Sequence, residues 1–275
     1  MTILSTALLF TTIAFGDDPS SFPSSGLDAK SLGRGGTAIA TIPGVSSTFG
    51  NPATLTPDGY YILGLEYLDP KGAPNTSLGL SVVDTSSSIR GALSYYRDPE
   101  FADFQKELWG IAFSQILMPS FYLGESIHLG EYEPTASPGS KEKLYAADAG
   151  LLYKLGDNVS IGYVAHNLFS SDRDVLEKYS GVGIGMMFPM SIYFTADYEE
   201  DPILTGESNL RTGIEFNPIE RITGRFGFQD RADGSTYLSA GITYTDANGS
   251  LDAAILYNDE TDKTDTVAFG LSMGM

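Results

Sequence analysis

The side chains best suited to catalysis in this chain are one serine and two histidines on segments that alternate like β-strands. Ser126 and His128 are two residues apart, His166 lies on a later segment, and both histidines fall on the face that carries small residues. A serine hydrolase needs its serine, its histidine and an orienting group in register, and a metal site needs a third ligand. Two neighbours on the same strand face do not have this geometry. We therefore predict no catalytic residue, no metal site and no cofactor.

Charged side chains form a second group that could do chemistry, because they fall on the same small-residue face. The arginines that we consider candidates for binding a ligand are Arg90, Arg211, Arg221 and Arg225. The acidic residues predicted on this face are Glu66, Asp148, Asp197, Glu215 and Asp252. An arginine can bind the carboxylate of a ligand through two parallel hydrogen bonds. Mixed signs on neighbouring strands also fit an internal ladder of salt bridges that holds a plug, and we favour this second interpretation.

The position of these residues depends on a pattern that runs from residue 60 to the end of the chain. About fourteen segments of roughly ten residues alternate bulky apolar side chains with small or polar ones. In the last segment, for example, Phe269 and Leu271 are bulky, whereas Ala268 and Gly270 are small. A soluble β-sandwich shows the same alternation, so the pattern alone does not assign the faces.

Two further features favour a barrel that spans a membrane. Tyr and Phe gather near the ends of the segments on the bulky face, where membrane barrels carry aromatic girdles. The other face is rich in glycine, as at Gly181, Gly183 and Gly185, which leaves room inside a barrel for another segment to lie against the wall. The sequence therefore predicts an all-β fold, a membrane-spanning antiparallel β-barrel of about fourteen strands.

The predicted strands and their connections also give a topology. The strands are residues 60–68, 76–84, 88–97, 106–115, 120–130, 143–154, 158–168, 179–188, 190–199, 207–216, 220–229, 235–244, 249–257 and 264–274. Connections after even-numbered strands are short, and most of those after odd-numbered strands are longer and charged. This alternation is typical of a bacterial outer-membrane barrel with both ends on the periplasmic side.

Composition narrows the compartment and the partners. The net charge of -19 leaves no basic surface for nucleic acid, and the absence of cysteine excludes disulfides and thiol chemistry. Residues 1–16 end in Ala14-Phe15-Gly16 and are similar to the apolar part and cleavage site of a secretory signal peptide. We expect three regions: a signal peptide at 1–16, an N-terminal segment at 17–58 and an outer-membrane barrel at 59–275.

Residues 28–55 do not alternate and carry two short motifs. The first is Ala29-Lys-Ser-Leu-Gly-Arg-Gly-Gly-Thr-Ala-Ile-Ala40, and the second is Phe49-Gly-Asn-Pro-Ala-Thr-Leu55. Together they resemble the N-terminal signature of the long-chain fatty acid transporter superfamily, which includes the PorV-like and PorQ-like barrels linked to type IX secretion. The resemblance implies a fourteen-stranded barrel whose N-terminal segment folds into the lumen as a hatch, with the Asn-Pro-Ala motif at the end of the hatch.

The resemblance also implies which residues form the hatch. They are Gly33, Arg34, Gly35, Gly36, Asn51, Pro52 and Ala53. Within such a hatch the glycines would let the backbone pass close to the wall, and the asparagine would satisfy backbone groups at a turn that the proline fixes. The same motif also fits a turn with no role in transport.

Three functions are compatible with this reading. The first is a channel for passive uptake of hydrophobic or amphiphilic, fatty-acid-like small molecules, gated by the hatch. The second is a PorV-like, secretion-associated barrel that docks protein partners, and the third is a purely structural barrel. The expected partners are outer-membrane lipid together with either a hydrophobic small-molecule ligand or secretion-system proteins. We favour the channel.

Overall fold

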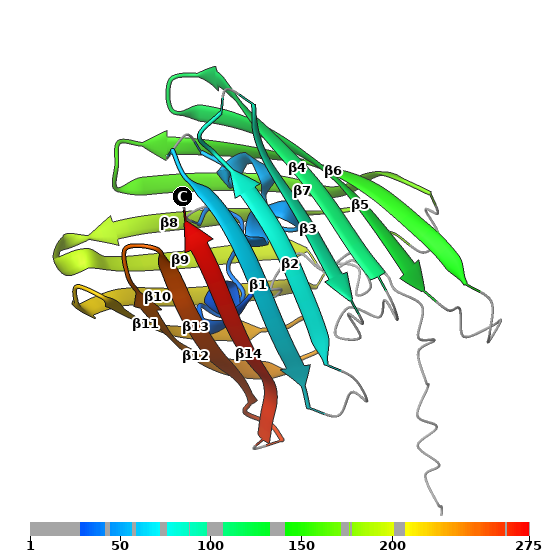
Figure 1. The fold of residues 1–275 in the computed structure, drawn as a ribbon. Coiled ribbons are helices and arrows are strands. Elements are labelled where there is room, and N and C mark those ends of the chain that lie inside the picture. The colour runs from blue at the N-terminus through cyan, green and yellow to red at the C-terminus, as the bar shows by residue number, and fades with distance from the viewer. Residues whose placement is uncertain are drawn as a thin grey trace, which may run out of the picture.

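A closed antiparallel barrel surrounds the N-terminal segment. The computed structural model describes residues 28–41, 45–56, 59–71, 76–87, 89–97, 107–132, 141–171, 176, 178–200, 207–261 and 263–274. Within these residues, fourteen strands pair with their neighbours in chain order, and the first strand pairs with the last to close the barrel (Figure 1). The predicted fold class is confirmed. The predicted signal peptide at 1–16 lies outside the described residues.

The elements begin and end as follows. The strands are β1 (Tyr61–Pro70), β2 (Ser77–Asp84), β3 (Arg90–Arg97), β4 (Glu107–Met118), β5 (Phe121–Tyr132), β6 (Glu142–Leu155), β7 (Val159–Ser170), β8 (Tyr179–Phe188), β9 (Ile192–Glu200), β10 (Ser208–Ile219), β11 (Ile222–Asp230), β12 (Thr236–Thr245), β13 (Gly249–Asn258) and β14 (Lys263–Gly274). The helices are α1 (Ala29–Gly33), η1 (Val45–Thr48), η2 (Pro52–Thr54) and η4 (Pro189–Ser191). Each predicted strand overlaps one observed strand.

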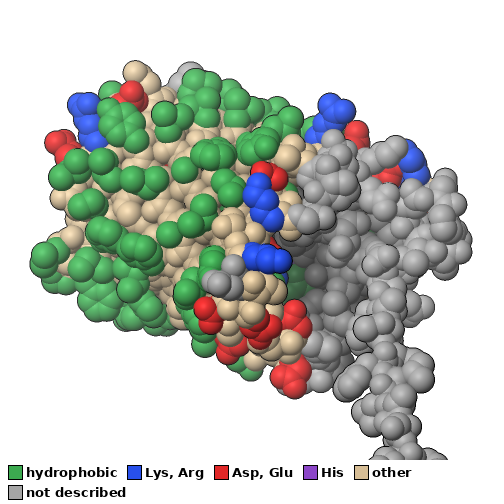
Figure 2. All heavy atoms as spheres, turned by 90° about the horizontal axis from the view of Figure 1, so that it is seen from below, with side chains coloured by type: hydrophobic (Ala, Val, Ile, Leu, Met, Phe, Trp, Pro, Cys, Tyr) green, Lys and Arg blue, Asp and Glu red, His purple; other side chains and the backbone are tan. Residues whose placement is uncertain are grey.

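The bulky face of the strands points out of the barrel. Phe269 is 52% exposed, whereas its neighbour Ala268 on the opposite face is 0% exposed. Figure 2 shows hydrophobic side chains spread over the wall, with acidic side chains gathered toward one end. Such an apolar exterior around a polar interior is the arrangement of a barrel in lipid. Among the described residues, no helix is long and apolar enough to cross a membrane.

Aromatic side chains on the outer face pair near both ends of the wall. At the end with the longer connections, the rings of Tyr95 and Trp109 lie 4.3 Å apart. At the end with the short turns, the rings of Phe121 and Tyr153 lie 6.5 Å apart. These pairs occupy the two levels at which interfacial girdles of membrane barrels are found.

Residues 28–41 and 45–56 lie inside the barrel, and we call them the hatch. Asp28 caps α1 because its carboxylate accepts a hydrogen bond from the backbone N–H of Ser31, at 2.7 Å. This helix contacts β11 to β14, whereas η1 contacts β2 to β4 and η2 contacts β4 to β6. The hatch therefore bridges opposite parts of the wall, as the helices inside the barrel show in Figure 1.

The hatch lies directly on the backbone of the wall because the strands present glycines to it. A Cβ atom added to Gly227 would lie 2.0 Å from the backbone nitrogen of Gly35, and one added to Gly162 would lie 2.1 Å from the carbonyl oxygen of Ile39. The wall glycines that face the hatch in this way are Gly110, Gly124, Gly150, Gly162, Gly181, Gly183, Gly185, Gly213, Gly227 and Gly241. Larger residues at these positions would displace the hatch.

Candidate functional site

The hatch is held to the wall by hydrogen bonds between side chains and backbone groups, and Asn51 is central to them. Its side-chain amide donates to the carbonyl oxygen of Ile39 at 2.7 Å and to that of Leu151 on β6 at 3.0 Å. Its side-chain oxygen accepts from the backbone N–H of Ala53 at 3.0 Å, at the start of η2. One asparagine therefore connects two parts of the hatch to each other and to the wall.

A second attachment lies along β7 and β9. The carboxylate of Asp197 accepts from the backbone N–H of Ala38 at 2.6 Å and from that of the next residue at 3.0 Å. The carbonyl oxygen of Ala40 accepts from the hydroxyls of Ser160 at 2.7 Å and Tyr193 at 3.1 Å. These wall side chains supply the hydrogen bonds that an irregular buried backbone would otherwise lack.

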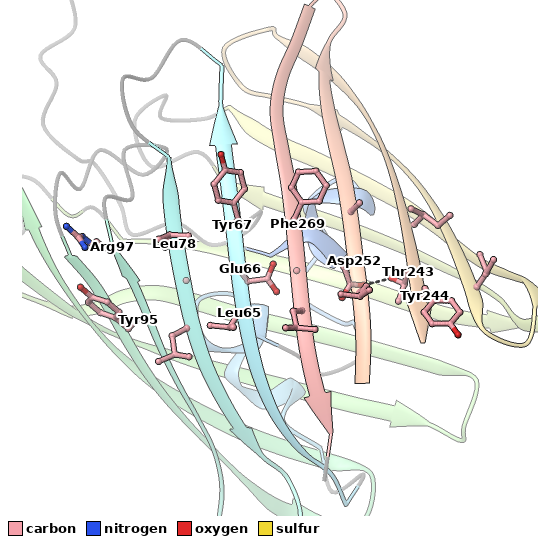
Figure 3. Close-up of a pocket in the computed structure, with 18 residues that line it drawn as sticks. Leu65, Glu66, Tyr67, Leu78, Tyr95, Arg97, Thr243, Tyr244, Asp252 and Phe269 are labelled. Carbon is pink, nitrogen blue, oxygen red and sulfur yellow. Dashed lines mark hydrogen bonds between the residues drawn. The ribbon is translucent and has the colours of Figure 1, made fainter. Parts of the chain in front are cut away.

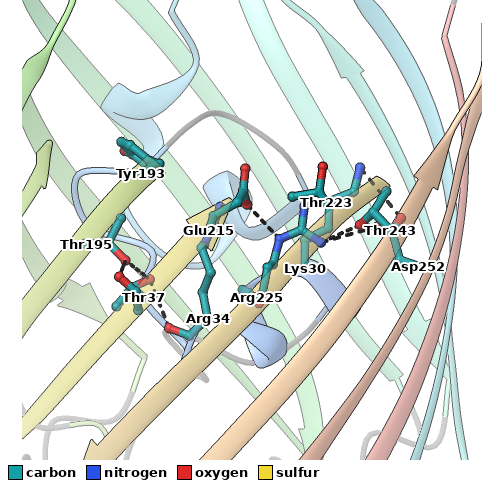
Figure 4. Close-up of polar contacts among 12 residues, drawn as sticks. Lys30, Arg34, Thr37, Tyr193, Thr195, Glu215, Thr223, Arg225, Thr243 and Asp252 are labelled. Atoms are coloured by element: carbon teal, nitrogen blue, oxygen red, sulfur yellow. Dashed lines mark hydrogen bonds and ion pairs between the residues drawn. The ribbon is translucent and has the colours of Figure 1, made fainter. Parts of the chain in front are cut away.

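Charged side chains of the hatch join charged side chains of β10, β11 and β13 (Figure 4). Glu215 lies 3.5 Å from the guanidinium of Arg34 in the hatch and accepts from Arg225 at 2.6 Å. Asp252 lies 3.6 Å from the ammonium of Lys30 and 3.9 Å from Arg225. The salt-bridge ladder suggested by the mixed charges is present here.

A buried chain of polar contacts runs from β5 to β10. The Nε2 atom of His128 and the Nδ1 atom of His166 lie 2.9 and 2.7 Å from the same oxygen of Asp148. On its other side, His166 lies 3.4 Å from Glu199, and Glu199 accepts from Arg211 at 2.5 Å. In this series of contacts each acidic side chain therefore lies beside a basic one.

The serine and histidine of β5 do meet, although their positions on the strand predicted otherwise. The hydroxyl of Ser126 lies 3.1 Å from Nε2 of His128, and Asp148 contacts that same nitrogen. In a catalytic triad the serine and the acid contact opposite nitrogens of the imidazole. The ring of Phe49 also stacks on His128, with the centroids 5.0 Å apart, and all these groups are buried. Ser126, His128 and Asp148 are therefore part of the packed interior of the barrel. In the described residues, no group of three or more His, Asp or Glu side chains is arranged to hold a metal ion.

The four candidate arginines have different surroundings. Arg211 and Arg225 lie on the luminal face and contact Glu199 and Glu215. Arg90 is buried on the same face, at the start of β3.

Arg221 does not lie in the lumen and is a correction to the predicted set. It lies exposed in the turn between β10 and β11. The predicted turn at 217–219 belongs instead to β10, because a bulge between Phe216 and Ile219 lengthens this strand. The turn is thereby moved to Glu220 and Arg221.

Sequence reasoning missed two contacts of the hatch. Asp28 caps α1, and an Asp placed just before a short helical segment is a signal that could have been recognised. Phe49 fills the space between Tyr96, at a centroid distance of 6.1 Å, and His128. The order of residues contains no signal for this packing, because the two rings belong to β3 and β5.

The outer wall carries an apolar hollow of about 860 Å³ across β1, β2, β3 and β11 to β14 (Figure 3). Leu65 and Tyr67 line it from β1, and Phe269 lines it from β14. The inward-facing Glu66 between them accepts a hydrogen bond from the backbone N–H of Ala29 in the hatch, at 3.2 Å. In this part of the barrel a single strand therefore separates an apolar outer hollow from the hatch.

Comparison with solved structures identifies the fold. The CymD monoaromatic hydrocarbon channel matches with a TM-score of 0.65 and 14% identity over 92% of this chain and 98% of that one. The Pseudomonas putida toluene transporter TodX matches with a TM-score of 0.61 and 14% identity over 93% and 98%. The outer-membrane protein Omp33 of Acinetobacter baumannii matches with a TM-score of 0.52 and 12% identity over 79% and 97%.

At these identities the likeness concerns the fold. No protein-family model matches the chain, and no curated protein matches it by sequence. The barrel with an internal N-terminal segment, expected from residues 28–55, is nevertheless the fold of the solved hydrocarbon channels and is confirmed.

Proposed function

We propose that this chain is a bacterial outer-membrane channel for passive uptake of hydrophobic or amphiphilic small molecules, with residues 28–56 as its hatch. The observation that carries the proposal is the way the hatch is held. It fills the lumen, yet its attachments are side-chain hydrogen bonds and ion pairs such as those of Asn51 and Asp197. Such a segment can shift while the strands remain paired.

The class of ligand is supported by two observations. Solved structures with this fold include channels named for monoaromatic hydrocarbons and for toluene. The barrel also presents an apolar hollow on its outer wall, lined by residues such as Leu65, Tyr67 and Phe269. Because neighbouring strands are paired around the whole described wall, we place the ligand path along the hatch and toward the periplasm.

Removal of the hatch tests the gate. We expect deletion of Asp28 to Phe49 to leave a folded barrel, because strand pairing closes it, and to produce a large steady conductance in planar bilayers. A barrel of fourteen strands lies between those of about eight, which side chains fill, and those of about sixteen, which hold an aqueous channel. Equal conductance with and without the hatch would refute the gate.

A second test keeps the hatch in the chain and substitutes single glycines of the wall. Gly162→Ala and Gly227→Ala each place a methyl group within the hatch backbone, so both should displace the hatch and conduct. Gly91→Ala is the matched control, since its Cβ would have no neighbour closer than 3.4 Å and its conductance should equal that of the wild type. If all three variants conduct no more than the wild type, a hatch that seals the lumen is contradicted.

Uptake by intact cells tests the transport itself. Cells carrying the chain in their outer membrane should take up radiolabelled toluene or dodecanoate faster than cells without it. If the folded protein gives no uptake of either compound, the alternative of a secretion-associated barrel that docks protein partners replaces the channel.

The orientation in the outer membrane can be measured separately. A cysteine at Glu260, in the connection before β14, should react with an impermeant maleimide on whole cells, whereas a cysteine at Asn248 should react only after the outer membrane is opened. The chain has no cysteine of its own to interfere. Labelling of both sites on whole cells would overturn this topology.

A further inference from the structure

Arg90 differs from the other arginines that line the lumen. It is 6% exposed, and its Nε and Nη1 atoms have no hydrogen-bond partner in the part of the chain that the structure describes. Arg211 and Arg225, by contrast, each contact a carboxylate. A buried guanidinium without a counter-charge is costly, so its presence calls for a partner that the described residues do not supply.

A second unpaired donor lies beside Arg90. Ser114 of β4 is directly opposite Arg90 of β3 in the strand register, on the same luminal face. Ser114 is 4% exposed, and its hydroxyl has no hydrogen-bond partner among the described residues. Side chains opposite each other in such a pair have Cβ atoms about 4.5–5.5 Å apart. Two guanidinium nitrogens and one hydroxyl are therefore available to the oxygens of one carboxylate.

Among the described acidic residues, the nearest to Arg90 in register is Asp84, which is paired with Gly91 at the end of β2. Its carboxylate accepts hydrogen bonds from the backbone N–H and the hydroxyl of Ser86, at 2.8 and 2.7 Å. Asp84 is thus bound within its own turn.

The surroundings of the two donors are apolar. Ala92 follows Arg90 by two residues and Ala112 precedes Ser114 by two, so both lie next to the donors on the luminal face. These alanines form a buried cluster with Val83 and with Leu55 of the hatch. The donors therefore lie where the hatch meets the wall, beside apolar side chains.

We propose that Arg90 and Ser114 form a head-group site for an amphiphile with one carboxylate, such as a fatty acid, at the end of the hatch nearest the short turns. This inference rests on the proposed channel function and specifies its substrate class. A neutral hydrocarbon would use the same path without this contact.

Binding of two ligands of equal length tests the site. Dodecanoate and dodecanol are titrated into the full-length protein in lipid nanodiscs, by competition with a fluorescent fatty acid. Arg90→Gln should weaken dodecanoate about tenfold or more and leave dodecanol within about twofold, because only the carboxylate uses the charge-assisted hydrogen bonds. Ser114→Ala should weaken dodecanoate about threefold. Arg221→Gln removes the same charge from an exposed turn and should change neither affinity.

Each other outcome has a definite meaning. Equal losses for both ligands, or no loss for either, would overturn the head-group site. Acetate or inorganic phosphate binding as tightly as dodecanoate would show an anion site without specificity for an amphiphile, which also contradicts the proposal. If Arg90→Gln fails to fold, Arg90→Lys keeps the charge but loses the two-pronged geometry, and an unchanged dodecanoate affinity there and in Ser114→Ala would overturn it. If the wild type neither binds dodecanol nor transports toluene, the channel function itself fails.

Discussion

The luminal wall has two contrasting sides. Along β5 to β10, Asp148 and Glu199 share their oxygens among two histidines and Arg211. Along β3 and β4, Arg90 is equally buried, yet its Nε and Nη1 atoms make no hydrogen bond with the described residues. The first side uses its charges to join neighbouring strands of the wall. The second leaves a charge available to something that comes from outside.

This contrast teaches that burial of a charge does not by itself reveal its role. Removing one partner of a buried pair leaves the other without compensation and is strongly destabilising. Removing a buried charge that has no partner takes away a cost. The two sides of the lumen should therefore respond to the same kind of substitution with opposite signs.

The largest effect is expected on the paired side. Glu199→Gln leaves Arg211 buried beside a neutral side chain and should lower the free energy of unfolding by about 3–5 kcal/mol. Urea unfolding in lipid vesicles, followed by the fluorescence of the single tryptophan, measures this. Glu200→Gln is the matched control on the exposed face and should change stability by less than about 0.5 kcal/mol. If Glu199→Gln lowers the free energy of unfolding by much less than this, the buried charge pairs do not stabilise the barrel as the comparison states.

A lysine introduced on the outer face of the barrel extends the comparison to a surface where the added charge has no partner. Ile255 is exposed near the middle of β13, and Ile255→Lys should cost roughly 2–4 kcal/mol if the site is near mid-bilayer. Leu251→Lys, on the same outer face near the start of the same strand, should cost at most about 1 kcal/mol. The same unfolding experiment measures both variants. Equal costs would contradict the assignment of the outer face to lipid.

On the unpaired side the expected sign is reversed. Arg90→Gln should raise the free energy of unfolding of the ligand-free barrel by about 1–3 kcal/mol, because it removes an unsatisfied buried charge. Added dodecanoate should stabilise the wild type more than the variant. A loss of stability in the variant without ligand would show that Arg90 is a structural residue.

The smallest effect concerns the hatch alone. Asp28→Ala removes the cap of α1 and should cost about 1 kcal/mol locally, with little effect on the wall. Hydrogen exchange should become faster at the amides of residues 31–33 and stay unchanged at those of β6. Faster exchange in both places would mean that hatch and barrel unfold as one unit.

The strands and the hatch could be predicted because their signals are local. Alternation of bulky and small residues, as at Phe269 and Ala268, fixes which face of a strand meets lipid, and glycines on one face indicate a close neighbour. Partners across strands are different, because they depend on register. Arg90 and Arg211 have the same pattern in the sequence, and only the pairing of β3 with β4 and of β9 with β10 distinguishes them. The bulge that moves Arg221 into a turn has no clear signal either.

The contacts of the hatch also have a consequence for the order of assembly. The helix α1 is the first described element in the chain, but most of its contacts are with β11 to β14, the last strands to be synthesised. The later parts of the hatch, η1 and η2, contact β2 to β6, which follow them closely. Contacts close in sequence form at lower entropic cost than distant ones. The hatch should therefore settle from its C-terminal end toward its N-terminal end, and α1 finds its place only as β14 reaches β1 and seals the barrel.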